Sequence, residues 1–577
     1  MGFLKPDLPV VDLAEWSKGT RAEKIRPMAK HWAEIGFGTP VVLHLFYVVK
    51  IVLYVLVGWL LVLTTDGIDG FTNVGAWWTE PIVFQKIVLY TMLFEVVGLG
   101  CGFGPLNNRF FPPLGSILYW LRPSTIRQPP WPTRVPLTAG DTRTPVDVVL
   151  YAALLVMITI ALFSNGTGPI PALDSAVGTL PMWLIAVIVV ILVLVGLRDK
   201  TIFLAARGEV YATLTVTFLF SGVDMIVAAK LVFLVIWIGA ATSKLNKHFP
   251  FVMATMMSNS PVIRTRRLKR KFFEHFPDDL RPGRLARIFA HVSTAIEMLV
   301  PLLLFFSGGG WLTAVAGDHH DLLSPGDPHG HTDGSSAGME RLHDLWGDHP
   351  VHRPCRDRPV RCRQPCAGGN PVRRRRRYRR PGKPVPDQGL VPLRHAVLRG
   401  QLGHHALVRQ TFCVPEDRRR IISIAAMPAA QLERVYGKEG AQIPLYLGYA
   451  FRAMNTHGRA LFTLAHRAMA GHPEESYVLT DGERICSMAM GWNFGDGHLS
   501  NEQLIEALQE RCHFEPGEVR IVLLDAQPIH KSTQAYRLVD AATGEFERGS
   551  VQVADMVTRQ PWDDTVPIRV DSGQSVR

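Results

Sequence analysis

Long apolar runs with few charged residues crowd into the first 310 positions of the 577-residue chain. Residues 146–164, for example, read VDVVLYAALLVMITIALFS. Runs of about 18 or more such residues are typical of membrane-spanning helices, which satisfy their backbone hydrogen bonds within lipid. The sequence therefore predicts an α-helical integral membrane bundle over residues 39–317. Its seven predicted spans are 39–64, 83–103, 146–164, 181–197, 202–222, 223–242 and 285–307.

The connectors between these spans alternate in charge. Residues 1–38 and the connectors after the second, fourth and sixth spans contain Lys and Arg, whereas connectors 65–82 and 165–180 contain none. Basic connectors stay in the cytoplasm, so we expect a multi-pass protein of the cell (inner) membrane with a cytoplasmic N-terminus. Residues 1–38 are predicted to form an amphipathic helix on the membrane surface or, alternatively, a short soluble helix.

The composition changes abruptly at residues 318–413. Between residues 318 and 411 the chain has no Ile and no Phe, but ten of its 21 His, so this low-complexity segment is predicted to be disordered as written. Reading each codon one base later restores an apolar pattern. We therefore interpret the segment as frame-shifted, with ten spans in the intended frame, and a genuine disordered loop is the alternative. Seven spans would place the C-terminus outside the cell, whereas ten would return it to the cytoplasm.

Two motifs in this segment look functional but are discounted with it. The arginine block Arg373–Arg377 resembles a nucleic-acid patch, and residues 319–331 resemble a His-rich metal tract. The cysteines of the segment do not have the spacing of a zinc site. We therefore expect neither nucleic-acid binding nor a metal site.

Residues 414–577 read as a soluble α+β domain with a disordered tail. Ser500 and Gln503 predict a capping box that opens the helix SNEQLIEALQERC. No Walker, Rossmann or nucleophile-elbow pattern occurs, so no cofactor is implied and its identity stays open. Alternation of apolar and polar residues predicts strands at 518–527, 535–541 and 548–557.

Ionisable groups inside the predicted spans are candidates for function, because charge is costly in lipid. Arg207 and Glu209 weaken the fifth span for the same reason. We expect the deepest carboxylates to pair with Lys50 or Lys230, and ordinary interhelical ion pairs are the alternative. Residues 243–261 place basic, amide and imidazole groups at the cytoplasmic membrane edge, a pattern suited to an anionic headgroup, to proton transfer or to a simple positive anchor. The candidate site residues are Glu95, Lys244, Lys247, His248, His291 and Glu297.

Several long stretches are distinctive: residues 1–40, NNRFFPPLGSILYWLRPSTIR (107–127) and TSKLNKHFPFVMATMMSNSP (242–261). With these, and with the GMRYYAGNWDTT that the shifted frame permits, the chain resembles an actinobacterial, largely mycobacterial, family of multi-pass transmembrane proteins without assigned function. The resemblance covers nearly the whole chain outside 318–413. It implies membrane residence but no activity.

Three functions fit these observations. The first is the handling of a lipid or cell-envelope precursor, as a transporter or accessory, with membrane lipids as partners. The second is a membrane-embedded enzyme that acts on a lipid-like substrate through the Lys244–His248 group. The third is a non-catalytic membrane scaffold. Whether the protein is an enzyme is left open by the sequence.

Overall fold

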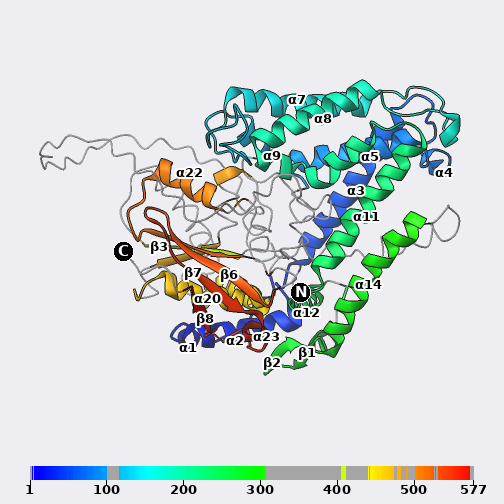
Figure 1. Cartoon of the computed structure of the whole chain (residues 1–577). Helices are drawn as coiled ribbons and strands as arrows, with labels where there is room; N and C mark the ends of the chain where they lie inside the picture. Colours follow the sequence, from blue (N-terminus) through cyan, green and yellow to red (C-terminus); the bar gives the residue numbers. More distant parts are fainter. Residues whose placement is uncertain are drawn as a thin grey trace, which may run out of the picture.

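A helical bundle and an α+β domain make up the computed structural model of the chain (Figure 1). The bundle is built from the first part of the chain and the domain from its last part, although the N-terminal helices pack on the domain. The structure describes residues 3, 6–100, 116–260, 262–263, 265–306, 404–410, 440, 442–472, 477–481, 486, 489–491, 499, 501–525, 527, 531–563 and 565–571.

Four helices are long and apolar enough to cross a membrane. They correspond to the first, third, sixth and seventh predicted spans: α3 (Val41–Leu63), α7 (Pro145–Phe163), α11 (Val223–Ser243) and α14 (Arg284–Phe306). The second and fourth predicted spans appear as α5 (Pro81–Val96) and α8 (Met182–Arg198), which have only 16 and 17 residues. A helix needs about 20 residues to cross the hydrocarbon core. The described residues thus support four of the seven spans.

The fifth predicted span is not a continuous helix. Its residues form α9 (Lys200–Ala205), the π-helical turn η3 (Gly208–Ala212) and α10 (Thr213–Thr217). Arg207 separates α9 from η3 with a left-handed φ of 50°, a conformation that a non-glycine residue rarely adopts and that interrupts a helix. The predicted span over 202–222 is therefore not one regular helix, although a discontinuous segment of this kind can still cross a membrane.

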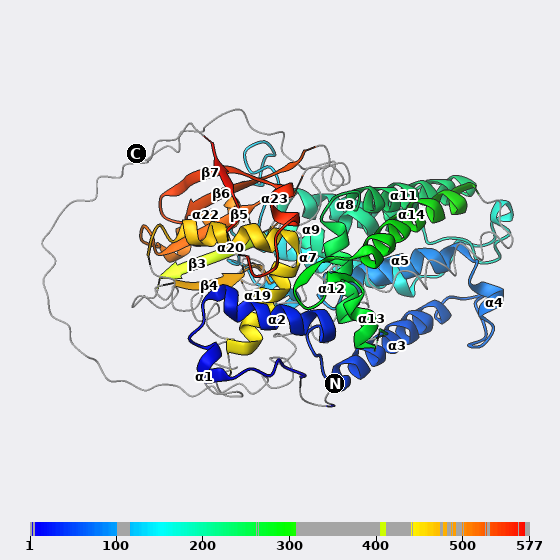
Figure 2. The same ribbon diagram turned by 90° about the horizontal axis from the view of Figure 1, so that it is seen from below.

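Helix α5 packs against α3, α7 and α10, and Figure 2 shows it running beside α3. Most of its side chains are buried. In contrast, α3 buries only Leu43 and Val62, and eleven of its apolar side chains are exposed. A helix that is apolar all round but unburied in the protein is suited to contact with lipid.

The connectors gather at two ends of the bundle according to their charge. The connector after α3 meets the one before α8, where the Asp66 backbone N donates to Asn165 Oδ1 over 3.0 Å. Neither of these connectors carries Lys or Arg. The basic connectors before α7 and after α8 meet each other, since the Lys200 backbone N donates to the Gln128 carbonyl over 2.9 Å. This basic end contacts the C-terminal domain.

The N-terminal segment forms α1 (Leu13–Trp16) and α2 (Arg21–Ile35), the latter opened by a capping box of Thr20 and Glu23. The apolar face of α2 includes Trp32 and packs on α12 (Phe249–Asn259) and on α19 (Gln442–Met454) of the C-terminal domain. The helix was predicted correctly, but its apolar face covers protein rather than the membrane surface.

The C-terminal domain is built on an antiparallel sheet with strand order β4-β3-β5-β6-β7-β8. Helices α20 and α23 pack on one face of the sheet, and α22 packs against β5 from the other side. The strands are β3 (His404–Gln410), β4 (Tyr477–Asp481), β5 (Val519–Leu524), β6 (Thr533–Asp540), β7 (Gly544–Gln552) and β8 (Ile568–Val570). The helices are α20 (Thr456–Ala468), α22 (Glu502–Cys512) and α23 (Val553–Val557).

Two local predictions for this domain need correction. Strand β3 lies inside the segment that was predicted to be disordered, and it pairs with both β4 and β5. The N-cap of α22 is Asn501, whose side chain accepts a hydrogen bond from the Leu504 backbone N, whereas the prediction placed the cap at Ser500, which lies outside the described residues. The remaining elements are α4 (Val74–Trp77), α6 (Ser116–Trp120), η2 (Pro171–Leu173), α13 (Arg266–Arg270), β1 (Phe273–His275) and β2 (Asp279–Pro282).

Candidate functional site

The break in the fifth predicted span places charged side chains inside the bundle. Arg207 Nε lies 2.9 Å from Glu209 Oε1, and the two side chains are only 20% and 22% exposed. A π-helical turn and a non-glycine residue in the left-handed region are both uncommon, and both cluster at functional sites. Their coincidence makes this break the first candidate site.

Glu95 on α5 lies beside the break. Its side chain is fully buried, and Tyr211 of η3 is within electrostatic range of Glu95, Arg207 and Glu209. A Cβ atom on Gly100 would lie 2.4 Å from the Glu95 carboxyl carbon. The turn after α5 can therefore follow the carboxyl group this closely only because residue 100 is a glycine.

Two polar side chains of α3 reach α5 near Glu95. Tyr54 Oη and Thr91 Oγ1 are 2.6 Å apart, and Tyr54 is within electrostatic range of Glu95. Lys50 Nζ donates to the Leu99 carbonyl over 2.9 Å. We refer to six of these residues as the bundle cluster: Lys50, Tyr54, Glu95, Arg207, Glu209 and Tyr211.

The bundle cluster combines carboxylates, cations and hydroxyl groups in apolar surroundings. Such groups are expensive inside a membrane, and where they occur they mark polar ligands, ion pathways or proton relays. A guanidinium group can bind a phosphate or carboxylate through paired hydrogen bonds, while a buried carboxylate can take up a proton. The arrangement suits recognition of a polar headgroup within the bilayer.

A second charged group lies at the basic end of the bundle. Lys244, just after α11, directs its Nζ to both carboxylate oxygens of Glu297 on α14, at 2.5 Å each. The expectation that Glu297 pairs with Lys50 or Lys230 was wrong. Helix α14 packs along α11, so the lysine that closes α11 is the one that reaches this carboxylate.

His248 joins this region to the C-terminal domain. Its Nδ1 hydrogen-bonds to Thr456 Oγ1 at the start of α20, and its backbone N donates to Asn246 Oδ1 over 2.8 Å. Nearby, the Arg459 guanidinium lies 4.7 Å from the centre of the Phe251 ring. Burial lowers the pKa of Arg459 to about 9. These contacts attach α12 firmly to α20.

The structure brings together some of the predicted site residues and separates others. Lys247 and His291 are exposed and join neither cluster. Thr456 and Arg459 were missed, because they lie on a helix that the sequence assigned to a separate soluble domain. Among the residues that the structure describes, no group of three His, Cys, Asp or Glu could hold a metal ion. The His-rich tract at 319–331 lies outside them.

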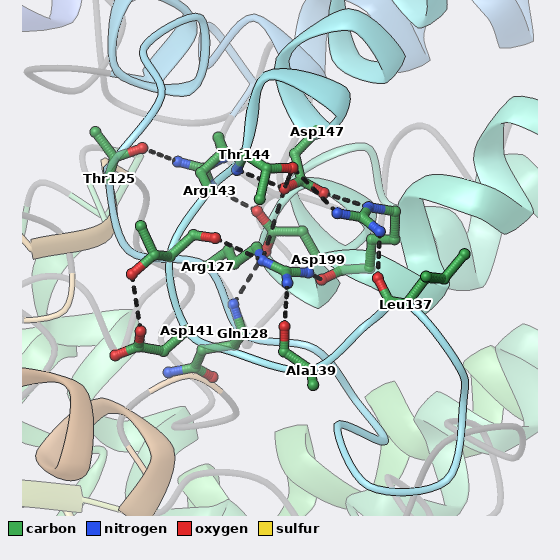
Figure 3. A network of polar contacts seen from close by, with 12 residues as sticks. Thr125, Arg127, Gln128, Leu137, Ala139, Asp141, Arg143, Thr144, Asp147 and Asp199 are labelled. Carbon is green, nitrogen blue, oxygen red and sulfur yellow. Dashed lines mark hydrogen bonds and ion pairs between the residues drawn. The ribbon is translucent and has the colours of Figure 1, made fainter.

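A buried ion-pair network holds the basic connectors together (Figure 3). Arg143 Nη2 and Asp199 Oδ2 are 2.5 Å apart, as are Arg198 Nε and Asp147 Oδ1. Arg127 lies 3.6 Å from Asp147 and donates to the Arg198 carbonyl over 2.7 Å. Because these charges largely compensate one another, we regard the network as a structural support that positions α9.

Comparison with known proteins agrees with a membrane protein of unassigned activity. A family model described as "transmembrane protein of unknown function (DUF3556)" matches residues 1–318 and 413–571. The residues between these two matches, 319–412, are nearly those at which the composition of the chain changes. No curated protein and no solved structure matches the chain. Because the match covers well over half of the sequence, the chain belongs to this family of transmembrane proteins of unknown function.

Proposed function

We propose that the protein handles a lipid or a lipid-linked cell-envelope precursor, as a transporter or as an accessory to one, by binding its headgroup at the bundle cluster. The observation that carries this proposal is the break at Arg207 beside the buried Glu95. Discontinuous membrane helices recur at the substrate sites of transporters, where helix ends and charged side chains meet polar groups within the bilayer. Placing these charged groups in apolar surroundings costs free energy. In this proposal, binding of a ligand is the reason that they are present.

The chemistry of the cluster suits an anionic headgroup. Arg207 offers a planar guanidinium to phosphate or carboxylate oxygens, and the hydroxyl groups of Tyr54 and Tyr211 add neutral hydrogen-bonding groups. The Glu95 carboxylate can accept hydrogen bonds from hydroxyl or ammonium groups of the headgroup. The exposed apolar side chains of α3 offer a lipid-facing surface for acyl or prenyl chains.

We further propose an inner-membrane topology with both the N-terminus and the C-terminal domain in the cytoplasm. Support comes from the core that α2 shares with α19, and from the contact of the basic connectors with the domain, because basic connectors stay in the cytoplasm. Two ends on one side require an even number of crossings. The ten spans of the shifted frame satisfy this requirement, whereas the seven spans as written do not.

This topology is tested with epitope tags in intact and permeabilised cells. Tags placed in the two connectors without Lys or Arg should react in intact cells, and a tag after residue 577 should react only after permeabilisation. A C-terminal tag that reacts in intact cells would contradict the proposal.

A membrane-embedded enzyme is the second candidate, and one observation favours it. Lys244, Glu297 and His248 gather at a single junction between the bundle and the C-terminal domain. The lysine and the imidazole already bind protein groups there, so a substrate would have to displace Glu297 or Thr456. Arg207 is likewise paired, with Glu209. It is the uncommon backbone at Arg207 and η3 that makes the headgroup site our preferred function over the enzyme and over a passive scaffold.

The decisive experiment measures lipid bound to the full chain. Wild type and the variants Glu95→Gln and Arg207→Gln are purified in a mild detergent, and the lipids that they retain are quantified by mass spectrometry. We expect Arg207→Gln to retain at least about tenfold less of the bound lipid, because it loses a charge-assisted contact to the anionic group in apolar surroundings. Glu95→Gln should also retain less, because it loses a carboxylate that accepts hydrogen bonds from hydroxyl or ammonium groups of the headgroup.

The matched control is Glu274→Gln, which removes a carboxylate on β1, outside the bundle, where it pairs with Arg287. It should retain lipid as wild type does. If Glu95→Gln and Arg207→Gln elute and melt as wild type does and keep the same lipid, the bundle cluster is not a headgroup site.

A further inference from the structure

We propose that the C-terminal domain regulates the bundle cluster through Gln128, a buried residue that links α22 to the first turn of α9. The inference rests on the proposed function, because α9 leads directly into the break that carries Arg207 and Glu209. It assigns the domain a regulatory part in headgroup binding.

The domain holds Gln128 by its side chain. Gln128 Nε2 donates to the Leu499 carbonyl over 2.8 Å, and Asn501 Nδ2 donates to Gln128 Oε1 over 3.3 Å. Only 1% of the residue is exposed. Asn501 is also the residue that caps α22. The nitrogen and the oxygen of the Gln128 carboxamide are therefore both hydrogen-bonded to residues just before α22.

The bundle holds the same residue by its backbone. The Gln128 backbone N donates to Asp199 Oδ1 over 3.3 Å, and its carbonyl accepts from the Lys200 backbone N over 2.9 Å. Asp199 Oδ1 also accepts from the Thr201 backbone N over 3.0 Å and so caps α9. Figure 3 shows Gln128 beside Asp199 within the network that surrounds this cap.

In this proposal the segment beyond α9 has a second, relaxed arrangement besides the one that the structure shows. Helix α9 has six residues and is about 9 Å long at 1.5 Å per residue, so a shift at its cap is carried directly to Arg207. The left-handed φ of Arg207 and the π-helical turn are both less favourable than regular α-helix. They persist only while α9 is held at its start. A displaced domain releases Gln128 and lets this segment relax, which moves Arg207 and Glu209 away from Glu95.

Amide hydrogen exchange of the full chain in nanodiscs tests the link. Gln128→Ala removes all of the side-chain bonds to the domain, including one to Met490 Sδ, but keeps the backbone bonds to Asp199 and Lys200. We expect about tenfold faster exchange in peptides covering residues 200–217, as local opening no longer has to break the link to the domain. Asn501→Ser keeps a cap for α22 but is too short to reach Gln128, so it should act in the same direction.

Gln503→Ala is the matched control. It removes a bond from the same helix to the neighbouring Pro129 carbonyl, 2.9 Å long, but leaves Gln128 untouched, and exchange in 200–217 should stay as in wild type. The inference is overturned if Gln128→Ala and Asn501→Ser leave that exchange unchanged, or if Gln503→Ala raises it equally. The hydrogen-exchange measurement does not rely on retained lipid, so the two proposals can fail separately. The exchange can be unchanged although the lipid-retention test succeeds, or changed although that test fails.

Discussion

The ion pair between Arg143 and Asp199 offers a quantitative test of how the basic end of the bundle is held. Its atoms are 2.5 Å apart, and the side chains are 0% and 2% exposed. Asp199 also accepts hydrogen bonds from the backbone N of Gln128 and Thr201. Arg143→Met keeps much of the side-chain volume but leaves the carboxylate buried without its cation. Breaking a buried pair by removing one partner costs about 3–5 kcal/mol.

We therefore expect Arg143→Met to lower the free energy of unfolding by about 3–5 kcal/mol. The matched control is Arg548→Gln, which removes an exposed pair with Glu545 three residues away. Such surface pairs contribute about 0.5 kcal/mol or less. The assay is equilibrium unfolding of the full chain in detergent mixed with increasing SDS, followed by tryptophan fluorescence. If Arg143→Met costs no more than the control, the network does not hold the connectors together.

Three further results are expected. Hydrogen bonds from Arg281 are the main cause that lowers the pKa of Asp279, so its pKa in the folded protein lies below the unfolded value of about 3.9. The ionised Asp279 therefore stabilises the fold fully well above pH 4, and this stabilisation is lost as the pH falls toward the folded pKa. The melting temperature of Asp279→Asn should accordingly fall less steeply between pH 6 and 3 than that of wild type, and a parallel decline would contradict this. A Cβ atom on Gly458 would lie 1.8 Å from the Arg452 carbonyl oxygen, so Gly458→Ala should cost at least about 2 kcal/mol, whereas Gly75→Ala, with open space around it, should melt close to wild type. Resequencing the gene across codons 310–420 should reveal a missing or extra base, and an intact reading frame would rule out the frame-error hypothesis.

Length and apolar composition were enough to predict the main helices of the bundle. A run such as that of α7 exposes too much apolar surface to be stable in water. The residues of the run are therefore enough, by themselves, to predict a membrane helix. In the sequence, the only sign of the break at Arg207 was the presence of two charged residues within a predicted span. The left-handed conformation of Arg207 depends on contacts with α5 and with the connectors, which the sequence does not show. Helix α2 was recognised by its periodicity, but periodicity does not say whether protein or lipid covers the apolar face.

The candidate site was harder to predict, because it depends on which helices are neighbours. Glu297 was singled out as one of the deepest carboxylates and is partly buried, yet its partner is Lys244 and not a lysine at similar depth in another span. Glu95 and Arg207 were each noted separately, and only the packing of η3 on α5 places them in one cluster. Thr456 carries no sequence signal at all, since a hydroxyl group at a helix start is ordinary.

The shared core of α2 and α19 has a consequence for biosynthesis. The ribosome completes α2 among the first 35 residues, but its packing partner begins at residue 442. Helix α12 can cover part of this face earlier. At about 5–20 residues per second, the part that faces α19 waits roughly 20–80 s before α19 has been translated. During that interval the nascent chain presents an apolar stripe beside the membrane, so a chaperone or the bilayer itself must shelter it until the last domain closes over it.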